Sequence, residues 1–377
     1  MTIRLNSSTR GYTEIDAPAV GGNNTLRLPG DNGTSGYLMQ TDGSGNLSWR
    51  DPSSLLSPYR NRIINGDMRI DQRNAGASVT IGTSGYVLDR WRHNVSQANK
   101  FSVQRNAGSI TPPAGFTNYL GITSLSAYSV TGNESFSTEH IIEGFNVADL
   151  DWGTANAKAA TLSFWVRSSL TGTFGGSIAT TKTAVWVMPF TYSIASANTW
   201  TYVTINIPAA TSTGGTNNDN TDGVYLRFGL GAAGTATGGT AGTWTSAGNF
   251  VQPAGTISIV GTNGATFYIT GVQLEAGSVA TPFERRSYGQ ELALCQRYYE
   301  TGRNSICVGG GTQGTLTDVK QTSSFAATKR ISVWNGTTSG VIGTVASINT
   351  FVDQIQVNYS AGVNNNFVCS WTASAEL

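Results

Sequence analysis

The chain has 377 residues, of which 12% are charged, and its 23 basic and 22 acidic residues leave a formal net charge of +1. This near balance disfavours a nucleic-acid binder that depends on a basic surface. No apolar run approaches the roughly 18 residues needed to span a bilayer. The first residues also lack an apolar signal segment, so membrane spanning and signal-peptide secretion are both disfavoured.

Residues 1–58 form the first predicted region, which is glycine-rich and poor in core residues. Within it, residues 38–49 predict a hairpin with its turn between Asp42 and Asn46. The region carries too few apolar side chains to fold alone, so we expect it to become ordered against other protein surfaces.

Residues 59–287 contain most of the predicted strands. Residues 161–167 alternate between apolar and polar side chains, which places Leu162, Phe164 and Val166 on one face. Four further segments alternate in the same way: residues 201–207, residues 224–228, the pair Ile257 and Ile259, and the pair Phe267 and Ile269. Turn-forming residues separate them. The pattern predicts an all-β fold, an antiparallel β-sandwich of the jelly-roll type.

Two stretches of this region, residues 208–222 and 229–247, read as long loops, and long loops are usually functional or mobile.

Residues 288–377 begin with the one convincing helix. Ser287 and Gln290 have the spacing of a capping box, and Leu292, Cys295 and Tyr299 fall on one helical face before Gly302 ends the helix. Residues 331–334, 355–357 and 367–371 then predict strands of a small C-terminal β domain. A core of this size is marginal alone, so we expect burial against partner copies.

Catalytic patterns are scarce. Asp149 and Asp151 are close in sequence but read as a turn rather than as a glycosidase pair. His93 and His140 lack partners at metal-ligand spacing and are interpreted as packing residues. Residues 217–223 offer oxygen ligands for calcium, yet an ordinary turn is favoured there, and a bound calcium ion stays open. We expect no enzymatic activity, no cofactor and no catalytic metal.

Arginine outnumbers lysine by 18 to 5, and arginine suits buried or interfacial ion pairs. The sequence predicts a structural network of arginine and aspartate at the start of the second region, made of Arg60, Arg62, Asp67, Arg73, Asp89 and Arg90. The alternative is a patch that binds anionic glycans, although the interleaved aspartates weaken an attractive field for anions.

Aromatic side chains are the candidates for stacking on a sugar. The candidate ligand-binding residues are Trp186, Tyr192, Tyr225, Trp244, Trp334 and Tyr359. For most of them, packing in the core or at an interface is the simpler interpretation. Trp244 has no apolar neighbours in its glycine-rich loop, where its side chain either packs into a partner copy or faces a ligand.

Several segments, in this order, resemble a widespread bacteriophage virion family. Residues 28–30 and 43–49 look like attachment segments of tail fibres. Residues 60–68, 72–73 and 86–91 look like the opening of the jelly-roll domain of this family. Residues 267–286, 291–299 and 371–377 look like its closing strand, the helix that follows and the chain ending. The family usually has an aromatic residue before the Gln72–Arg73 pair, where this chain has Asp71.

The resemblance implies a bacteriophage virion structural protein, a tail fibre or similar appendage that contacts host surface glycans. Because the small C-terminal domain, the amphipathic helix and the weak-core N-terminus all need external burial, we predict a homotrimer. Residues 1–58 would attach it to other tail or capsid proteins. The alternative is a capsid or tail decoration protein without a receptor role. A depolymerising tailspike is disfavoured, because carboxylates are scarce and no β-helix repeat occurs.

Overall fold

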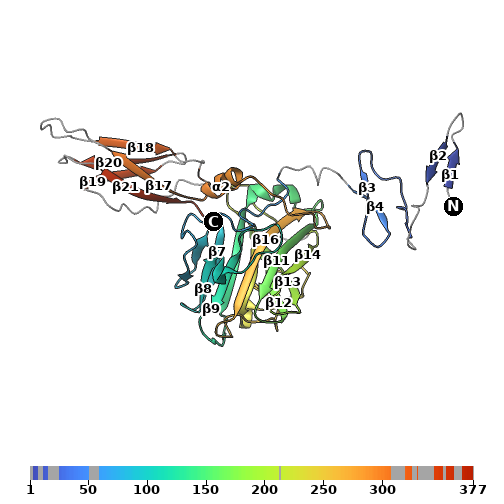
Figure 1. Ribbon diagram of the computed structural model, residues 1–377, viewed down its shortest axis with the longest axis horizontal. Helices are drawn as coiled ribbons and strands as arrows, with labels where there is room; N and C mark the ends of the chain where they lie inside the picture. The colour runs from blue at the N-terminus through green and yellow to red at the C-terminus, as the bar shows by residue number, and fades with distance from the viewer. Residues whose placement is uncertain are drawn as a thin grey trace. The chain divides into compact units, whose positions relative to one another are not determined.

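A computed structural model describes residues 3–6, 12–15, 25–50, 59–211, 214–306, 319–324, 329, 344–350, 354–360 and 367–376 (Figure 1). The chain divides into two compact units, Met1–Arg60 and Asn61–Leu377. The first unit contains two antiparallel strand pairs, β1 (Ile3–Asn6) with β2 (Tyr12–Ile15) and β3 (Leu38–Thr41) with β4 (Leu47–Arg50).

The predicted hairpin of the first unit is confirmed. The backbone N–H of Asp42 donates to the carbonyl of Asn46 at 3.1 Å. The Asp42 carboxylate accepts from the N–H groups of Ser44 at 2.8 Å and Asn46 at 3.0 Å. An aspartate at the start of a turn closes it in this way because its short side chain reaches backbone donors a few residues ahead.

The second unit is built around two six-stranded antiparallel sheets. The first sheet has the order β13 (Trp186–Ile194), β12 (Gly172–Thr180), β15 (Asp222–Ala232), β10 (Ser135–Glu143), β7 (Trp91–Val95) and β6 (Gly85–Leu88). The second has the order β14 (Thr201–Ile207), β11 (Ala160–Ser168), β16 (Thr266–Ala276), β9 (Leu120–Ser124), β8 (Phe101–Arg105) and β5 (Val79–Thr80). Four short 3-10 turns, η1 (Ala107–Ser109), η2 (Gly144–Asn146), η3 (Ala148–Leu150) and η4 (Gly234–Ala236), lie between strands.

One continuous hydrophobic core lies between the two sheets. Leu162, Phe164 and Val166 of β11 are fully buried, as the alternation predicted. The facing sheet contributes Phe228, whose ring centroid lies 5.0 Å from that of Phe164 in an edge-to-face contact. The predicted all-β sandwich is therefore confirmed.

The segment around Ile257 and Ile259 was predicted as a strand, and this prediction is wrong. Ile259 is fully buried, but the segment is irregular and its backbone makes isolated bonds, from Ile257 N–H to Thr173 O and from Val260 N–H to Leu230 O. Its apolar residues cover the edge of the core without joining a sheet. The second predicted loop also begins too early, because Gly229–Ala232 belongs to β15.

The rest of that loop lies along the free edge of β13, the last strand of the first sheet. Val187 N–H donates to Thr245 O at 2.9 Å, and Gly242 N–H donates to Pro189 O at 2.8 Å. The segment that follows this loop lies over the outer face of β12 at Gly175, where a Cβ atom would approach Thr256 Cγ2 to 2.9 Å. The outer face of the first sheet is thus partly closed by the chain itself.

Helix α2 (Tyr288–Gln296) has the predicted capping box. Gln290 N–H donates to Ser287 Oγ at 3.3 Å, and Ser287 N–H donates to Gln290 Oε1 at 3.0 Å. Cys295 is fully buried and Leu292 packs beside it. Tyr299, predicted on the same helical face, instead begins a strand.

The predicted stop at Gly302 is wrong, since the helix ends at Gln296. Gly302 lies inside β17 (Tyr299–Ile306), opposite Trp371 of β21 (Phe367–Ser374). The early end buries Tyr298, whose hydroxyl donates to Glu143 at 2.5 Å. Pairing of the whole strand with β21 outweighs the continuation of the helix.

The C-terminal part contains three further strands, β18 (Val319–Ser324), β20 (Gln354–Ser360) and β19 (Thr344–Thr350), in that order in one antiparallel sheet. The strands predicted at residues 355–357 and 367–371 are confirmed, and the one predicted at 331–334 lies outside the described residues. No helix in the described part of the chain is long and apolar enough to cross a membrane.

Candidate functional site

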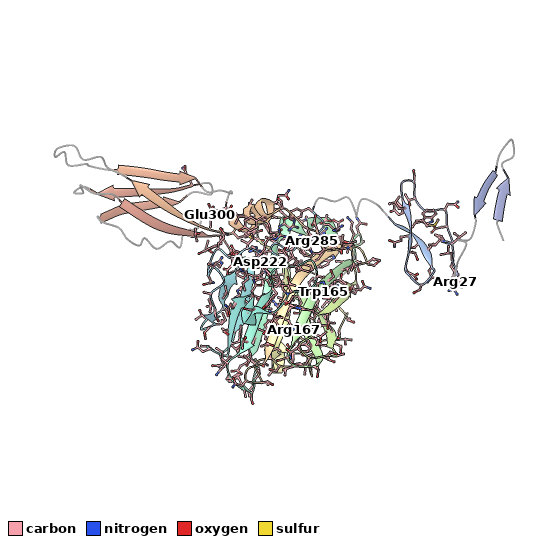
Figure 2. All side chains as sticks on the ribbon, in the orientation of Figure 1. Arg27, Trp165, Arg167, Asp222, Arg285 and Glu300 are labelled. Atoms are coloured by element: carbon pink, nitrogen blue, oxygen red, sulfur yellow. The ribbon has the colours of Figure 1, made fainter. Side chains whose placement is uncertain are left out.

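The outer face of the second sheet carries aromatic side chains that are partly or largely exposed. Because alternate residues of β11 fill the core, Ser163, Trp165 and Arg167 lie on the opposite face. The strand register pairs Trp165 with Tyr202 of β14, and their ring centroids lie 5.2 Å apart at 49°. The Tyr202 side chain is 46% exposed. Figure 2 labels Trp165 and Arg167 on this strand.

A β-bulge in the neighbouring strand shapes the surface beside Trp165. The pairing of β11 with β16 shifts between Ser163, opposite Gln273, and Trp165, opposite Thr270. The extra residues of β16 include Gly271, whose φ is +62°. A glycine in this left-handed conformation is typical of a bulge, and bulges change the direction of neighbouring side chains.

Gly271 also makes room for a ring. A Cβ atom at this position would lie 2.6 Å from Phe116 Cζ and 3.3 Å from Trp165 Cδ1. The Phe116 ring therefore lies directly over the strand backbone, next to Trp165. The missing side chain of Gly271 turns this part of the sheet into the floor of a groove.

One wall of the groove comes from the segment that follows β16. Phe283 makes an edge contact with Phe116, with centroids 5.2 Å apart. The guanidinium of Arg285 lies 4.8 Å from the Phe116 centroid and 5.7 Å from the Phe283 centroid. Arg285 is exposed, and it is one of the residues labelled in Figure 2.

The groove has a volume of about 250 Å³. Its lining residues are Phe116, Ser163, Trp165, Tyr202, Gly271, Pro282, Phe283 and Arg285. Exposed aromatic rings beside a small number of polar groups bind ligands that have an apolar face and hydroxyl or charged substituents. The volume is near the lower end of small-molecule pockets, roughly 300–1,000 Å³, so the groove suits one unit of a larger ligand.

A second aromatic cluster supports the same face. Arg167 is the register partner of Tyr268, which packs with Tyr119 at a centroid distance of 5.4 Å. The Tyr119 hydroxyl donates to Ala107 O and accepts from Ile110 N–H, both at 2.7 Å. Burial raises the pKa of Tyr119, and the nearby positive charge of Arg167 opposes this rise. This hydrogen-bonded cluster holds the sheet face rigid beside the groove.

The aromatic residues predicted as ligand contacts do not meet on one surface. Trp186 and Val224 both pair with Thr180, so their side chains lie on the same face of the sheet, the face of the core to which Val224 points. Tyr225 follows Val224 along the strand and therefore lies on the face opposite Trp186. Tyr225 is half-buried, and its hydroxyl donates to Asp222.

Tyr192 is wrong as a ligand contact. It is 5% exposed and stacks on Phe174 with a centroid distance of 5.7 Å, so neither ring face is available to a sugar.

Trp244 fills a gap in its own chain, which neither predicted alternative included. Its ring makes an edge contact with Trp152 at 5.3 Å, and its Nε1–H donates to Pro208 O at 2.9 Å. Trp334 lies outside the described residues. Tyr359 lies in β20, but its side chain is outside them as well.

The predicted arginine residues make ion pairs, but mostly with carboxylates far away in sequence. Arg62 donates to Asp149 at 2.5 Å. Arg73 donates to Glu376 at 2.7 Å, and the fully buried Arg90 pairs with the same carboxylate. Arg60 is partly buried at the end of the first unit.

The predicted aspartates have other partners. Asp67 pairs with Arg69, which was not in the predicted network. Asp89 accepts from the backbone and side-chain nitrogens of Gln72 at 2.7 and 2.6 Å. Burial raises the pKa of Asp89, which those hydrogen bonds oppose. Most of the ion pairs and hydrogen bonds of these arginine and aspartate residues therefore connect separate parts of the fold, while Arg73 also acts electrostatically on Asp89.

The loop considered for calcium is held by bonds of its own. Asp219 accepts from the N–H of Thr221 at 2.8 Å, and the Asn217 amide donates to Asp222 O at 3.1 Å. Among the described residues, no group of three or more His, Cys, Asp or Glu side chains could hold a metal ion.

The groove residues were missed at the sequence level. Trp165 and Tyr202 each occupy an outward position in a correctly predicted strand, between residues that point into the core. An aromatic residue at an outward position of a half-buried strand is the signal that could have identified them. The contribution of Phe116 had no such signal, since it depends on the bulge at Gly271.

No protein-family model matches the chain, and no curated protein matches it. Among solved structures, the enzymatically active domain of a tailspike protein of bacteriophage CBA120 matches with 13% identity and a TM-score of 0.32, over 59% of this chain and 22% of the tailspike chain. A protein of Bacteroides thetaiotaomicron described as sugar-binding matches with 13% identity and a TM-score of 0.34, over 58% of this chain and 100% of that one.

A family 11 carbohydrate-binding module of Clostridium thermocellum, solved with a mixed-linked tetrasaccharide, matches with 14% identity and a TM-score of 0.26, over 55% of this chain and 100% of the module. These are distant similarities of fold, so the function of the groove has to be inferred from its own residues.

Proposed function

We propose that this protein is a non-enzymatic bacteriophage virion protein, a homotrimeric tail fibre that binds host surface carbohydrate through the groove on the second sheet. The observation that supports carbohydrate binding is the pair of the half-buried Trp165 and the exposed Tyr202 beside the Arg285 guanidinium. A pyranose ring has an apolar face of C–H groups that stacks on an aromatic plane, while its hydroxyl groups bond to polar side chains at the rim.

The absence of catalysis is part of the proposal. The eight residues that line the groove include no carboxylate, whereas glycoside hydrolysis commonly uses two across one bond. The groove is therefore assigned to binding without cleavage.

Virion location and trimer formation are supported by the resemblance to the phage family and by the surface of the first unit. Leu26, Leu28, Leu38 and Met39 are between 47% and 74% exposed there. Such a group of apolar side chains is expected to be buried against neighbouring copies or other virion proteins. Three copies would also increase the avidity of weak carbohydrate contacts.

Binding of the purified protein to an array of bacterial capsular and lipopolysaccharide glycans tests this function. Trp165→Ala and Tyr202→Ala should each weaken binding about ten- to 150-fold, which corresponds to the roughly 1.5–3 kcal/mol from covering one aromatic side chain. The matched controls are Phe145→Ala and Tyr288→Ala, because both rings are 59% exposed and lie outside the groove.

Each outcome separates the candidate functions. Binding without product release supports a binding protein, whereas release of shorter glycans would show an enzyme. No binding by a correctly folded trimer would favour the alternative, a capsid or tail decoration protein. A stable monomer at micromolar concentration would refute the trimer, and particles that still incorporate protein lacking residues 1–58 would refute the attachment role.

A further inference from the structure

On the basis of the proposed carbohydrate-binding function, we propose that the groove selects glycans that carry a carboxylate, such as polymers of uronic acid. The feature that points to this ligand class is Arg285, the charged residue among those lining the groove. In the described part of the chain it has no ion pair with a carboxylate.

This situation is unusual for an arginine of the sandwich. Arg62, Arg73, Arg90, Arg92 and Arg297 each pair with a carboxylate. In a chain that pairs its arginines so widely, an exposed arginine beside aromatic rings is available for an anionic ligand.

The carboxylates nearest to Arg285 in sequence already bond to groups on the side of the segment that faces the sandwich. Glu284 accepts from Asn61 N–H at 2.6 Å and lies 3.4 Å from the guanidinium of Arg286. Arg286 itself turns inward, where it also contacts Glu291 at 3.3 Å. Consecutive residues of this extended segment point to opposite sides, so Arg285 faces outward, away from these negative charges.

The guanidinium is held in place before any ligand binds. Its central carbon lies over the Phe116 and Phe283 rings, 4.8 and 5.7 Å from their centroids, and one terminal nitrogen would lie 2.9 Å from a Cβ atom at Gly115, whose φ is +84°. These cation–π contacts use none of the guanidinium N–H groups, which leaves them for hydrogen bonds to a ligand. The planar N–H edge of a guanidinium matches a carboxylate in a bidentate pair.

A second positive charge lies on the same face of the sheet. Arg167 is two residues from Trp165 along β11, and its buried Nε has no hydrogen-bond partner in the described structure. Arg285 and Arg167 therefore place two positive charges on this face, although the formal charge of the whole chain is only +1. A sugar ring on Trp165 and Tyr202 would place a ring carboxylate within reach of Arg285.

Capsular polysaccharides that contain uronic acid provide the test, each used in its native form and after chemical reduction of its carboxyl groups to alcohols. The two forms share linkage and length and differ in charge. Wild-type protein should bind the native form at least about tenfold more tightly, because charge-assisted hydrogen bonds are roughly twice as strong as neutral ones. Raising the salt concentration should reduce this preference.

Arg285→Gln should remove the preference for the native form while weaker binding of the reduced form persists. Arg285→Lys should keep part of the preference, because it keeps the charge but loses the planar edge. Lys182→Gln is the control for an exposed positive charge outside the groove. Unchanged melting temperatures would confirm that all variants fold.

The two levels of the proposal fail in different ways. If Trp165→Ala abolishes binding of both forms, but wild type binds both equally, then carbohydrate binding stands and carboxylate selection is refuted. A preference that survives Arg285→Gln also refutes it. If the wild-type trimer binds neither form of any polysaccharide, or if Trp165→Ala leaves binding unchanged, the proposed function of the groove is itself refuted.

Discussion

Acidification should destabilise the sandwich through the buried side chain of His93. This residue of β7 is fully buried, its ring makes an edge contact with Phe101 at 6.2 Å, and neither ring nitrogen has a hydrogen-bond partner among the described residues. Burial, with a smaller contribution from Arg92, lowers the pKa of His93 from 6.5 to about 3. The folded protein therefore holds a neutral ring at a pH where the unfolded chain binds a proton.

The sign and size follow from this difference in pKa. Stability is fully present above pH 6.5 and is lost as the pH falls toward 3, because the unfolded state gains the proton first. Between pH 8 and pH 5 the loss from His93 is about 2 kcal/mol, since each unit of pKa difference corresponds to about 1.4 kcal/mol. Burial and the charge of Arg90 also lower the pKa of His140, which adds a loss in the same direction.

Urea unfolding of wild type and His93→Leu at pH 8 and pH 5 measures this effect. At pH 8 the two proteins should have similar stability, because the ring loses no hydrogen bond and the volumes are similar. The free energy of unfolding of the variant minus that of wild type should be about 2 kcal/mol larger at pH 5 than at pH 8.

The difference between the two proteins matters more than the total pH dependence. Burial raises the pKa of Asp89 and of Glu291, so each of these carboxyls makes the fold more stable as the pH falls. Both proteins contain them, so their effect cancels in the comparison. Equal losses of stability in wild type and variant between pH 8 and pH 5 would refute the reasoning.

Two further substitutions test packing. Gly271→Ala should destabilise the fold by at least about 1–2 kcal/mol from its left-handed backbone alone, displace Phe116 and weaken glycan binding. The control is Gly255→Ala, which is also at positive φ but has nothing within 4 Å of a new Cβ, and equal effects of the two substitutions on binding would contradict the role of Phe116. Trp244→Ala should lower the melting temperature, at about 2 kcal/mol for lost burial against Trp152, and leave glycan binding per folded particle intact; lost binding with unchanged melting would restore a ligand role.

The strands could be predicted from the sequence because burial on one face leaves a period-two pattern. This held for residues 201–207, where core positions alternate with more exposed ones, and for residues 160–168, where apolar core positions alternate with outward residues that are themselves buried or half-buried. The pattern failed at Ile257 and Ile259, because an irregular segment that covers the core also needs apolar residues. The capping box at Ser287 was predicted correctly, since its signal is local, whereas the end of the helix depends on a strand partner about 70 residues away.

The candidate site was harder to predict because it combines residues that are distant in sequence. Trp165, Tyr202 and Arg285 come from two strands and a following segment, and the bulge at Gly271 determines how the rings meet. The aromatics chosen from sequence were prominent in loops and strands, yet Tyr192 fills the core and Trp244 packs on its own chain. Burial of an aromatic side chain depends on what packs against each face of its sheet, and the composition of the chain does not contain that information.

The strand pair β17 and β21 has a consequence for how this chain can evolve. Ile306 and Phe367 are register partners, so the ends of residues 307–366 already lie together. Ala375 N–H donates to Tyr298 O, and Glu376 binds Arg73 and Arg90, which fastens the base of the pair to the sandwich. The entropy of closing a loop grows slowly with its length, so this insertion can be lengthened, shortened or replaced at little expense of stability. Changes of sequence or length between Ile306 and Phe367 are therefore expected to leave the sandwich and its groove unchanged.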